Sequence, residues 1–189
     1  METGPNILCK LCCMLPLLAM IALAVPEHVV ATTLKEGDSA PDLTLKNQDG
    51  KEVTLSKVWD KNIVVLYFYP MDDTPGCTKE ACFFRDMNHE FRQVGAEIIG
   101  ISVDDVASHK KFAEKHRLPF TLLADPEKKA VDRYGVKSKL MFGKAKRMTF
   151  VVDRGGIIRK IYPDVDVSLH SREVLDFIKT MHSHTAPRQ

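Results

Sequence analysis

The run Ile63–Tyr69 constrains the fold of this chain more than any other segment. Its residues are apolar, β-branched or aromatic without a break, which is typical of a strand that is buried on both faces of a sheet. Pro70 ends the run. A strand covered on both faces requires helices above and below its sheet, so the sequence predicts a layered α/β domain.

The remaining patterns alternate strands with helices and add a hairpin at each end. Turn residues predict a hairpin within Gly37–Thr54 and a second hairpin that joins Arg147–Asp153 to Gly156–Tyr162. Periodicity predicts two further strands, at Glu97–Val103 and Phe120–Leu123. It also predicts a helical turn at Leu55–Trp59 and helices at Cys77–Val94, Val106–His116, Glu127–Tyr134 and Ser168–His182. We therefore expect a mixed central sheet with helices on both faces and an N-terminal hairpin extension.

Residues 1–31 are expected to precede the folded domain. The apolar run Leu11–Val25 has 15 residues, fewer than the roughly 20 of a membrane span and typical of a secretory signal peptide. We expect export to the periplasm or another extracytoplasmic space, with cleavage after Ala31 or at an earlier alanine. A membrane anchor and a cytoplasmic chain with a mis-assigned start are the alternatives. The domain is predicted over residues 34–182, followed by a flexible tail at 183–189.

The charge balance does not favour a nucleic-acid partner. The formal net charge is +2 over 189 residues, and no basic stripe is interleaved with aromatic residues. The densest basic cluster contains Lys144, Lys146 and Arg147, and its two lysines are interpreted as part of a solvated loop. No glycine-rich phosphate loop or dinucleotide fingerprint is present, so no nucleotide cofactor is predicted.

The five cysteines divide into two groups. Cys9, Cys12 and Cys13 lie in or beside the predicted signal peptide, and no second pair of ligands accompanies their metal-like spacing. Only Cys77 and Cys82 remain in the predicted domain. A loop between cysteines five residues apart is too short to stabilise a fold much, so a functional role is favoured for this pair.

Cys77 is predicted in the first turn of a helix that follows the buried strand. Free backbone N–H groups and the helix dipole at that position favour a thiolate, the nucleophilic form of the side chain. Thr74 is close enough for its hydroxyl to reach the sulfur, although it is also a typical N-cap residue. Pro70 either forms a wall of the site or only ends the strand.

Cys82 lies five residues after Cys77. In one continuous helix the two residues are separated by a rise of about 7.5 Å and by about 140° of rotation, and their Cα atoms lie beyond the limit of about 7 Å for a disulfide. The two sulfurs can therefore meet only if the first turns of the helix unwind. A small buried core thiol is the alternative interpretation of Cys82.

Arginines and histidines are candidate partners for the thiolate. Arg85 is too far along the helix to contact Cys77 and is expected to pair with Asp86 or with another surface acid. Arg147 opens a predicted strand, and the sheet could bring it beside the cysteine. His109 and His116 share one helix face, which is interpreted as a solvated surface.

The pattern Pro70-x-x-x-Thr74-x-x-Cys77 resembles the active site of the peroxiredoxins. Its extension to Cys82 resembles peroxiredoxin Q, also called bacterioferritin comigratory protein. The similarity covers about residues 34–180 and includes the stretches Leu34–Pro41, Val65–Tyr69, Gly100–Val103, Phe120–Asp125, Tyr134–Val136 and Arg147–Asp153.

This resemblance implies a thioredoxin-like fold and the reduction of hydrogen peroxide and organic hydroperoxides. It makes Cys77 the peroxidatic and Cys82 the resolving cysteine of an intramolecular disulfide, Thr74 the hydroxyl that orients the peroxide, Arg147 the active-site arginine and Pro70 the pocket proline. It implies no metal or flavin, a monomer or a dimer, and thioredoxin or a similar dithiol protein as reductant. Export of the chain would leave the identity of that reductant open.

Two other functions compete with the peroxidase. A thiol–disulfide oxidoreductase acting on proteins is disfavoured because such enzymes usually carry Cys-x-x-Cys in the first helical turn. A metal-binding module would need Cys77 and Cys82 together with His89, His182 or His184, but helical spacing places the two cysteines on different faces.

Overall fold

The structure is a computed structural model that describes Met1 and residues 33–183. The predicted signal peptide beyond Met1, and residues 184–189 of the predicted tail, lie outside the described residues. None of the helices between residues 33 and 183 combines the length and the hydropathy that a bilayer crossing requires.

The strands of the described chain form one mixed sheet in the order β2-β1-β5-β4-β3-β6-β7. The three parallel strands are β3 (Ile63–Phe68), β4 (Ala96–Ser102) and β5 (Thr121–Ala124). β6 (Met148–Val152) runs antiparallel to β3, and β7 (Ile158–Tyr162) runs antiparallel to β6. The predicted mixed sheet is confirmed, and β3 lies near its centre, where a doubly buried strand belongs.

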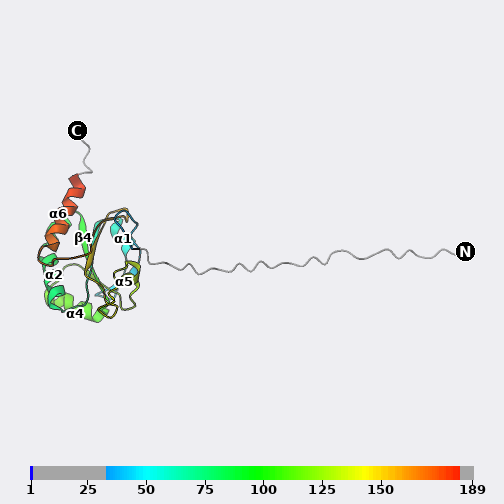
Figure 1. Cartoon of the computed structure of the whole chain (residues 1–189), viewed down its shortest axis with the longest axis horizontal. Helices are drawn as coiled ribbons and strands as arrows, with labels where there is room; N and C mark the ends of the chain where they lie inside the picture. Colours follow the sequence, from blue (N-terminus) through cyan, green and yellow to red (C-terminus); the bar gives the residue numbers. More distant parts are fainter. Residues whose placement is uncertain (2–32, 184–189) are drawn as a thin grey trace, which may run out of the picture. The chain divides into compact units, whose positions relative to one another are not determined.

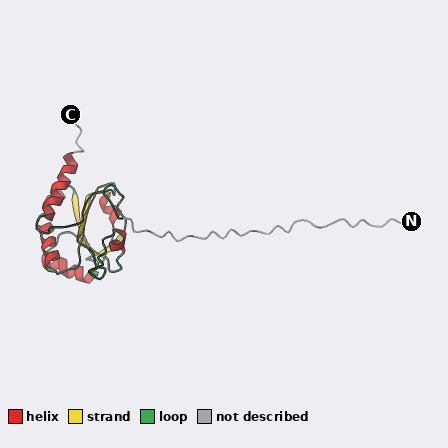
Figure 2. Ribbon diagram, viewed as in Figure 1, coloured by secondary structure: helices red, strands yellow, loops and turns green. Residues whose placement is uncertain are grey.

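Helices cover both faces of the sheet, as β3 requires. Val65 and Tyr67 face a core that also contains side chains of α2 (Pro75–Asp86), α3 (Asn88–Gln93), α4 (Val106–His116) and α6 (His170–Ser183). Val64 and Leu66 face the opposite core, with α1 (Leu55–Trp59) and α5 (Lys129–Arg133). Figure 1 and Figure 2 show α2, α4 and α6 on one side of the sheet and α1 and α5 on the other.

Both predicted hairpins are present. β1 (Thr44–Asn47) and β2 (Glu52–Thr54) pair antiparallel, and Gly50 takes the positive φ of 76° that their turn requires. The second hairpin joins β6 to β7 through a turn that includes Gly156, whose φ is 74°. A Cβ on Gly156 would lie 2.9 Å from the indole nitrogen of Trp59, so this turn also needs glycine for its close packing.

Two predicted helices differ from the observed ones. The helix predicted over Cys77–Val94 is two helices, α2 and α3, separated at Met87, where φ is −101° and ψ is 5°. The apolar periodicity hides this break because Phe84 and Phe91 stay buried on the same side. The helix predicted from Glu127 starts at Lys129, because Lys128 takes the left-handed conformation with φ 60°.

The parallel strands place the chemistry of the molecule at one edge of the sheet. β3, β4 and β5 end at the same edge because they run in the same direction. The loop after β3 leads to Cys77, and the loop after β4 leads to the start of α4. Residues that are far apart in the sequence therefore meet around the cysteine.

Candidate active site

Cys77 occupies the first turn of α2, as the sequence predicts. Thr74 is the N-cap residue and Pro75 is the first helical residue, a position where proline has the required φ and no N–H to satisfy. The helical hydrogen bonds begin with the N–H of Thr78 donating to the carbonyl of Thr74 at 2.8 Å. The N–H groups of Gly76 and Cys77 consequently have no acceptor within the helix and favour an anion nearby.

Arg147 provides the cation beside this cysteine. It directly precedes β6, and the pairing of Met148 with Phe68 brings it next to the end of β3. Its Nη2 atom lies 3.3 Å from the Sγ atom of Cys77. A Cβ on Gly76 would approach the same nitrogen to 3.3 Å, so glycine there lets the guanidinium come close. A fixed positive charge at this distance stabilises a thiolate.

Glu80 is a member of the site that the sequence analysis missed. It is 1% exposed, and its Oε2 atom pairs with Nη1 of Arg147, so the guanidinium bridges carboxylate and sulfur. Burial raises the pKa of Glu80 to about 7, against the opposing effect of Arg147. Its position three residues after Cys77, on the same helix face, was the available signal.

Thr74 and Pro70 lie on the loop that leads to the cysteine. The hydroxyl of Thr74 donates to the carbonyl of Met71 at 3.1 Å, and its side chain does not cap the helix through a hydrogen bond. Pro70 is half-buried directly after Tyr69. Both residues lie in the segment that precedes Cys77, and the roles assigned to them by resemblance stay predictions.

A buried polar cluster anchors this loop to α4. Asp72 is 6% exposed. Its Oδ1 accepts from the hydroxyl of Tyr69 at 2.7 Å, and its Oδ2 accepts from the hydroxyl of Ser108 at 2.7 Å. The Nδ1 atom of His109 lies 2.9 Å from the same Oδ2. These contacts fix the conformation of the loop in a dry environment, where unpaired polar groups would be costly.

The interpretation of His109 as a solvated surface residue is wrong. Its side chain is fully buried, and its Nε2 atom lies 3.1 Å from the carbonyl oxygen of Leu123. A carbonyl only accepts hydrogen bonds, so Nε2 donates to Leu123, while Nδ1 faces the carboxyl group of Asp72. His116, by contrast, is half-buried and contacts the exposed Asp73 at 3.1 Å.

Cys82 lies half-buried on α2, and both cysteines are free thiols. Arg85 pairs with Asp86 at 2.8 Å, as predicted. Its Nη1 also donates to the carbonyl of His116 at 2.9 Å, which ties the far end of α2 to α4. The α2 helix is continuous from Pro75 to Asp86, so the two sulfurs need a local rearrangement before they can bond.

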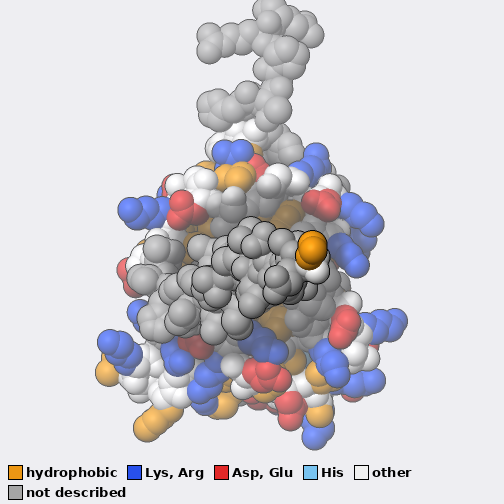
Figure 3. Space-filling view, turned by 90° about the vertical axis from the view of Figure 1, so that its right-hand side faces the viewer, with side chains coloured by type: hydrophobic (Ala, Val, Ile, Leu, Met, Phe, Trp, Pro, Cys, Tyr) orange, Lys and Arg blue, Asp and Glu red, His pale blue; other side chains and the backbone are white. Residues whose placement is uncertain are grey.

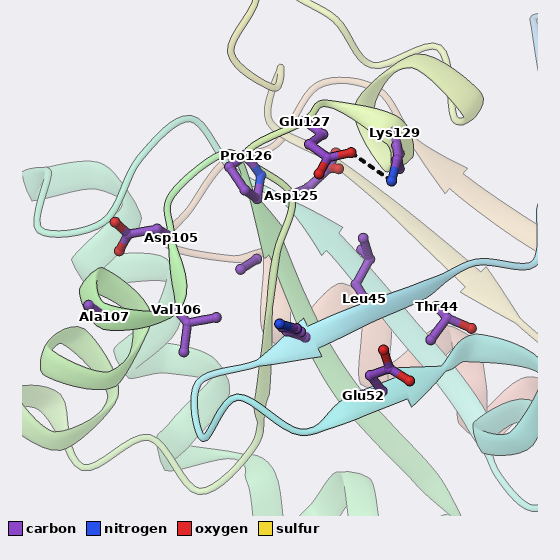
Figure 4. Close-up of a pocket in the computed structure, with 12 residues that line it drawn as sticks. Thr44, Leu45, Glu52, Asp105, Val106, Ala107, Asp125, Pro126, Glu127 and Lys129 are labelled. Carbon is purple, nitrogen blue, oxygen red and sulfur yellow. Dashed lines mark ion pairs between the residues drawn. The ribbon is translucent and has the colours of Figure 1, made fainter.

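A cavity of about 530 Å³ lies away from this cysteine. Figure 4 shows it beside β1, the start of α4 and the segment that follows β5. Several of its charged groups have partners within the protein. Glu127 pairs with Lys129 at 2.6 Å, and Asp105 accepts a hydrogen bond from the N–H of Ser108 at 2.8 Å. Within residues 33–183, no three histidine, cysteine or acidic side chains gather in a way that could hold a metal ion.

Comparisons with known proteins agree with this geometry. Residues 37–161 match the AhpC/TSA family. Chloroplastic peroxiredoxin Q of Triticum aestivum is 48% identical over 159 residues, which cover 84% of this chain and 73% of the relative. Chloroplastic peroxiredoxin Q of Arabidopsis thaliana is 47% identical over 154 residues, which cover 81% of this chain and 71% of the relative.

Solved structures show the same fold. Peroxidoxin BcpB from Mycobacterium tuberculosis superimposes with a TM-score of 0.74 at 37% identity, over 78% of this chain and 98% of that one. The Xanthomonas campestris bacterioferritin comigratory protein, whose structure concerns alkyl peroxide reduction, gives a TM-score of 0.69 at 33% identity, over 74% and 91% of the two chains. The predicted thioredoxin-like fold is confirmed, and the chain belongs to the peroxiredoxin Q group of the AhpC/TSA family.

Proposed function

We propose that this protein is a thiol peroxidase in which the thiolate of Cys77 attacks a hydroperoxide. The contact of 3.3 Å between Nη2 of Arg147 and the sulfur, in the first turn of α2, carries this proposal. The sulfur bonds to one peroxide oxygen as the O–O bond breaks. The other oxygen leaves as an alkoxide or hydroxide, takes up a proton and departs as an alcohol or water, while Cys77 becomes a sulfenic acid.

Arg147 is placed to act on both negative charges of this step. It faces the thiolate before the attack, and the leaving oxygen gains negative charge close to the same guanidinium. Glu80 holds the guanidinium from its other side. Thr74 is proposed to orient the peroxide with its hydroxyl, after turning from the carbonyl of Met71, and Pro70 is proposed to restrict water around the sulfur.

Cys82 is proposed to resolve the sulfenic acid. Its thiol attacks the oxidised sulfur of Cys77, a disulfide forms and the hydroxyl leaves as water. Because α2 holds the two residues apart, its first turns must unwind for this step. A dithiol protein such as thioredoxin then supplies two electrons and two protons, which restore both thiols and release an oxidised dithiol.

Burial of Cys77 favours a peroxidase over a thiol–disulfide oxidoreductase that acts on proteins. The residue is only 2% exposed, so in the folded helix it is accessible to a hydroperoxide group rather than to the cysteine of a folded protein. A protein reductant would gain access only after the disulfide has formed and α2 has unwound.

A stopped-flow experiment tests this function. Reduced protein mixed with hydrogen peroxide should consume it, and Cys77→Ser should abolish the reaction. Cys82→Ser should keep the first turnover and lose cycling with thioredoxin. Mass spectrometry after one equivalent of peroxide should show a disulfide between the two cysteines in the wild type and a sulfenic acid in Cys82→Ser. Full steady-state activity of Cys82→Ser would remove Cys82 from the resolving role.

Residues 1–31 are proposed to be a cleaved export signal that precedes a monomeric domain over residues 34–182. The family match begins at residue 37, after this segment, and its apolar run is shorter than a membrane span. The plant relatives are named as chloroplastic, so an organelle-targeting segment is the competing interpretation. Fractionation of the native cells and N-terminal sequencing of the protein would separate the two.

A further inference from the structure

Most of the large exposed apolar side chains of residues 33–183 lie in two segments, the loop before Cys77 and residues 137–146. Leu140 and Phe142 are 94% and 95% exposed, and Met71, in the loop before Cys77, is 37% exposed. Elsewhere in the described domain only Leu169 is comparably large, apolar and exposed. We call residues 137–146 the basic loop, and Leu140 with Phe142 the apolar tip.

The basic loop is built to hold its tip in solvent. The N–H of Ser138 donates to the carbonyl of Lys144 at 2.8 Å, and the N–H of Gly143 donates to the carbonyl of Ser138 at 3.0 Å. Ala145 and Ser138 anchor the base, because both are buried. Phe142 takes a φ of 51°, a strained conformation for a bulky residue. The exposure of the tip is therefore maintained by ordered backbone.

All charges of this segment have the same sign. Residues 137–147 contain four lysines and one arginine and no acidic residue. Lys139 and Lys146 are exposed, and neither forms an ion pair with a described residue. On the face shown in Figure 3, basic and acidic side chains are interspersed. Lys137, by contrast, pairs with Asp132 at 2.9 Å. The apolar tip thus lies between two lysines, Lys139 and Lys146, that have no acidic partner among the described residues.

The base of the loop also touches the active site. The Nζ atom of Lys144 lies 2.9 Å from the Sδ atom of Met71, and the loop leads directly into Arg147, which contacts Cys77. Any surface that binds the apolar tip is therefore connected to the active site through the base of the basic loop.

We propose that the basic loop docks on anionic membrane lipid, with the apolar tip in the headgroup–acyl boundary and the lysines on the phosphates. Apolar and aromatic side chains beside lysines are the combination that binds such a surface. A second copy of this chain would bring two basic loops together, and their like charges would repel. Two projecting side chains also suit a deformable bilayer better than a rigid protein partner, which needs a broad complementary face.

This docking defines a substrate class, and it rests on the proposed peroxidase function. Hydroperoxides of membrane phospholipids lie at the depth the tip would reach, so docking would deliver them to Cys77. The reaction is the one described above, with the lipid alcohol as the leaving product.

A fluorescent tip tests the docking in the full chain. The native Trp59 is buried, so Phe142→Trp adds an exposed indole only at the tip. We expect its emission to shift to shorter wavelength, and to be quenched by brominated acyl chains, on vesicles of phosphatidylcholine with phosphatidylglycerol. Leu169→Trp is the matched control and should not respond. A local probe keeps the result independent of any binding by residues 1–31.

Charge reversal tests the role of the lysines. In the Phe142→Trp background, Lys139→Glu with Lys146→Glu should weaken the response by on the order of tenfold or more. The exposed pair Lys110→Glu with Lys111→Glu, on α4, is the matched control and should leave it nearly unchanged. Leu140→Ser should weaken vesicle binding by about tenfold, since it removes one large apolar side chain.

Activity links the docking to the substrate. The rate on phospholipid hydroperoxide in anionic vesicles, divided by the rate on hydrogen peroxide, should fall by about tenfold in Leu140→Ser and stay unchanged in Leu169→Ser. If the wild type consumes no peroxide, the proposed peroxidase function is contradicted, whereas the vesicle-binding result is unaffected.

Three results would overturn the docking proposal. The first is a tip that gives no response to anionic vesicles, or the same response to pure phosphatidylcholine vesicles. The second is a response that appears without lipid as the protein concentration rises, which would assign the tip to a second copy. The third is a response that appears only with thioredoxin, which would assign it to the reductant.

Discussion

The loop before Cys77 and the helix that carries the cysteine are attached to the molecule by different forces. The loop is fixed by directional polar contacts, in which Asp72 accepts from Tyr69 and Ser108 and pairs with the buried His109. Apart from the one buried pair of Glu80 with Arg147, the helix α2 is held mainly by apolar packing, with Ala81 and Phe84 buried in the core. Polar networks enforce one geometry, whereas apolar contacts are non-directional.

This difference matches the two tasks of the site. Attack on a peroxide needs the sulfur, the helix N-terminus and Arg147 in one fixed arrangement, which the anchored loop supplies. Disulfide formation needs α2 to unwind, which apolar packing permits at lower cost than a buried charge network. We therefore expect substitutions in the loop anchor to act on stability, and substitutions around the helix to act on chemistry.

The largest effect is expected from His109→Leu. It leaves the carboxyl group of Asp72 buried without its His109 partner, which should lower the free energy of unfolding by about 3–5 kcal/mol. The urea midpoint measures this loss. His116→Leu, at a half-buried position on the same helix, is the control and should lose far less. Equal losses in the two variants would contradict the anchoring role of His109.

Arg147→Ala should act on the reaction more than on the fold. Removing one group that stabilises developing charge typically slows a reaction by about 10²–10³-fold, equivalent to roughly 3–4 kcal/mol. The rate constant of Cys77 oxidation by hydrogen peroxide, measured by stopped flow, checks this. Arg85→Ala is the control, since Arg85 pairs with Asp86, and should keep the wild-type rate. An unchanged rate in Arg147→Ala would remove Arg147 from the site.

Glu80→Gln should change the dependence of stability on pH. Burial raises the pKa of Glu80 to about 7 from its ordinary 4.5. Between pH 4.5 and about 7, Glu80 therefore keeps its proton in the folded state and has lost it in the unfolded state. Stability of the wild type should therefore fall as pH rises between these values, by roughly 3 kcal/mol. The difference between the unfolding curves of wild type and Glu80→Gln isolates this effect, and parallel curves would contradict it.

Lys115→Ala should have the smallest effect. Lys115 pairs at 2.8 Å with Asp73, which is next to Asp72, but their side chains are 61% and 45% exposed. Exposed ion pairs contribute about 0–1 kcal/mol, so the urea midpoint should hardly move. A loss as large as that of His109→Leu would mean that the exposed contacts, and not the buried cluster, hold the loop.

Much of this architecture could be predicted because its signals are local. The buried strand, both hairpins and the helix Val106–His116 follow from periodicity and turn residues, and Cys77 is placed by the strand-to-helix pattern around it. The buried pair of Asp72 and His109 could not be predicted, because its partners are 37 residues apart and α4 buries a histidine that pattern alone leaves on the surface. The exposure of Leu140 and Phe142 could not be predicted either, because it depends on the backbone conformation of the basic loop.

The rate of Cys77 oxidation in the Cys82→Ser variant tests the central claim most directly, since only one reactive thiol then remains in the domain. If the helix N-terminus and Arg147 activate this sulfur, its second-order rate constant with hydrogen peroxide at neutral pH should exceed that of free cysteine in the same buffer by at least about a hundredfold. A rate constant equal to that of free cysteine would contradict the account.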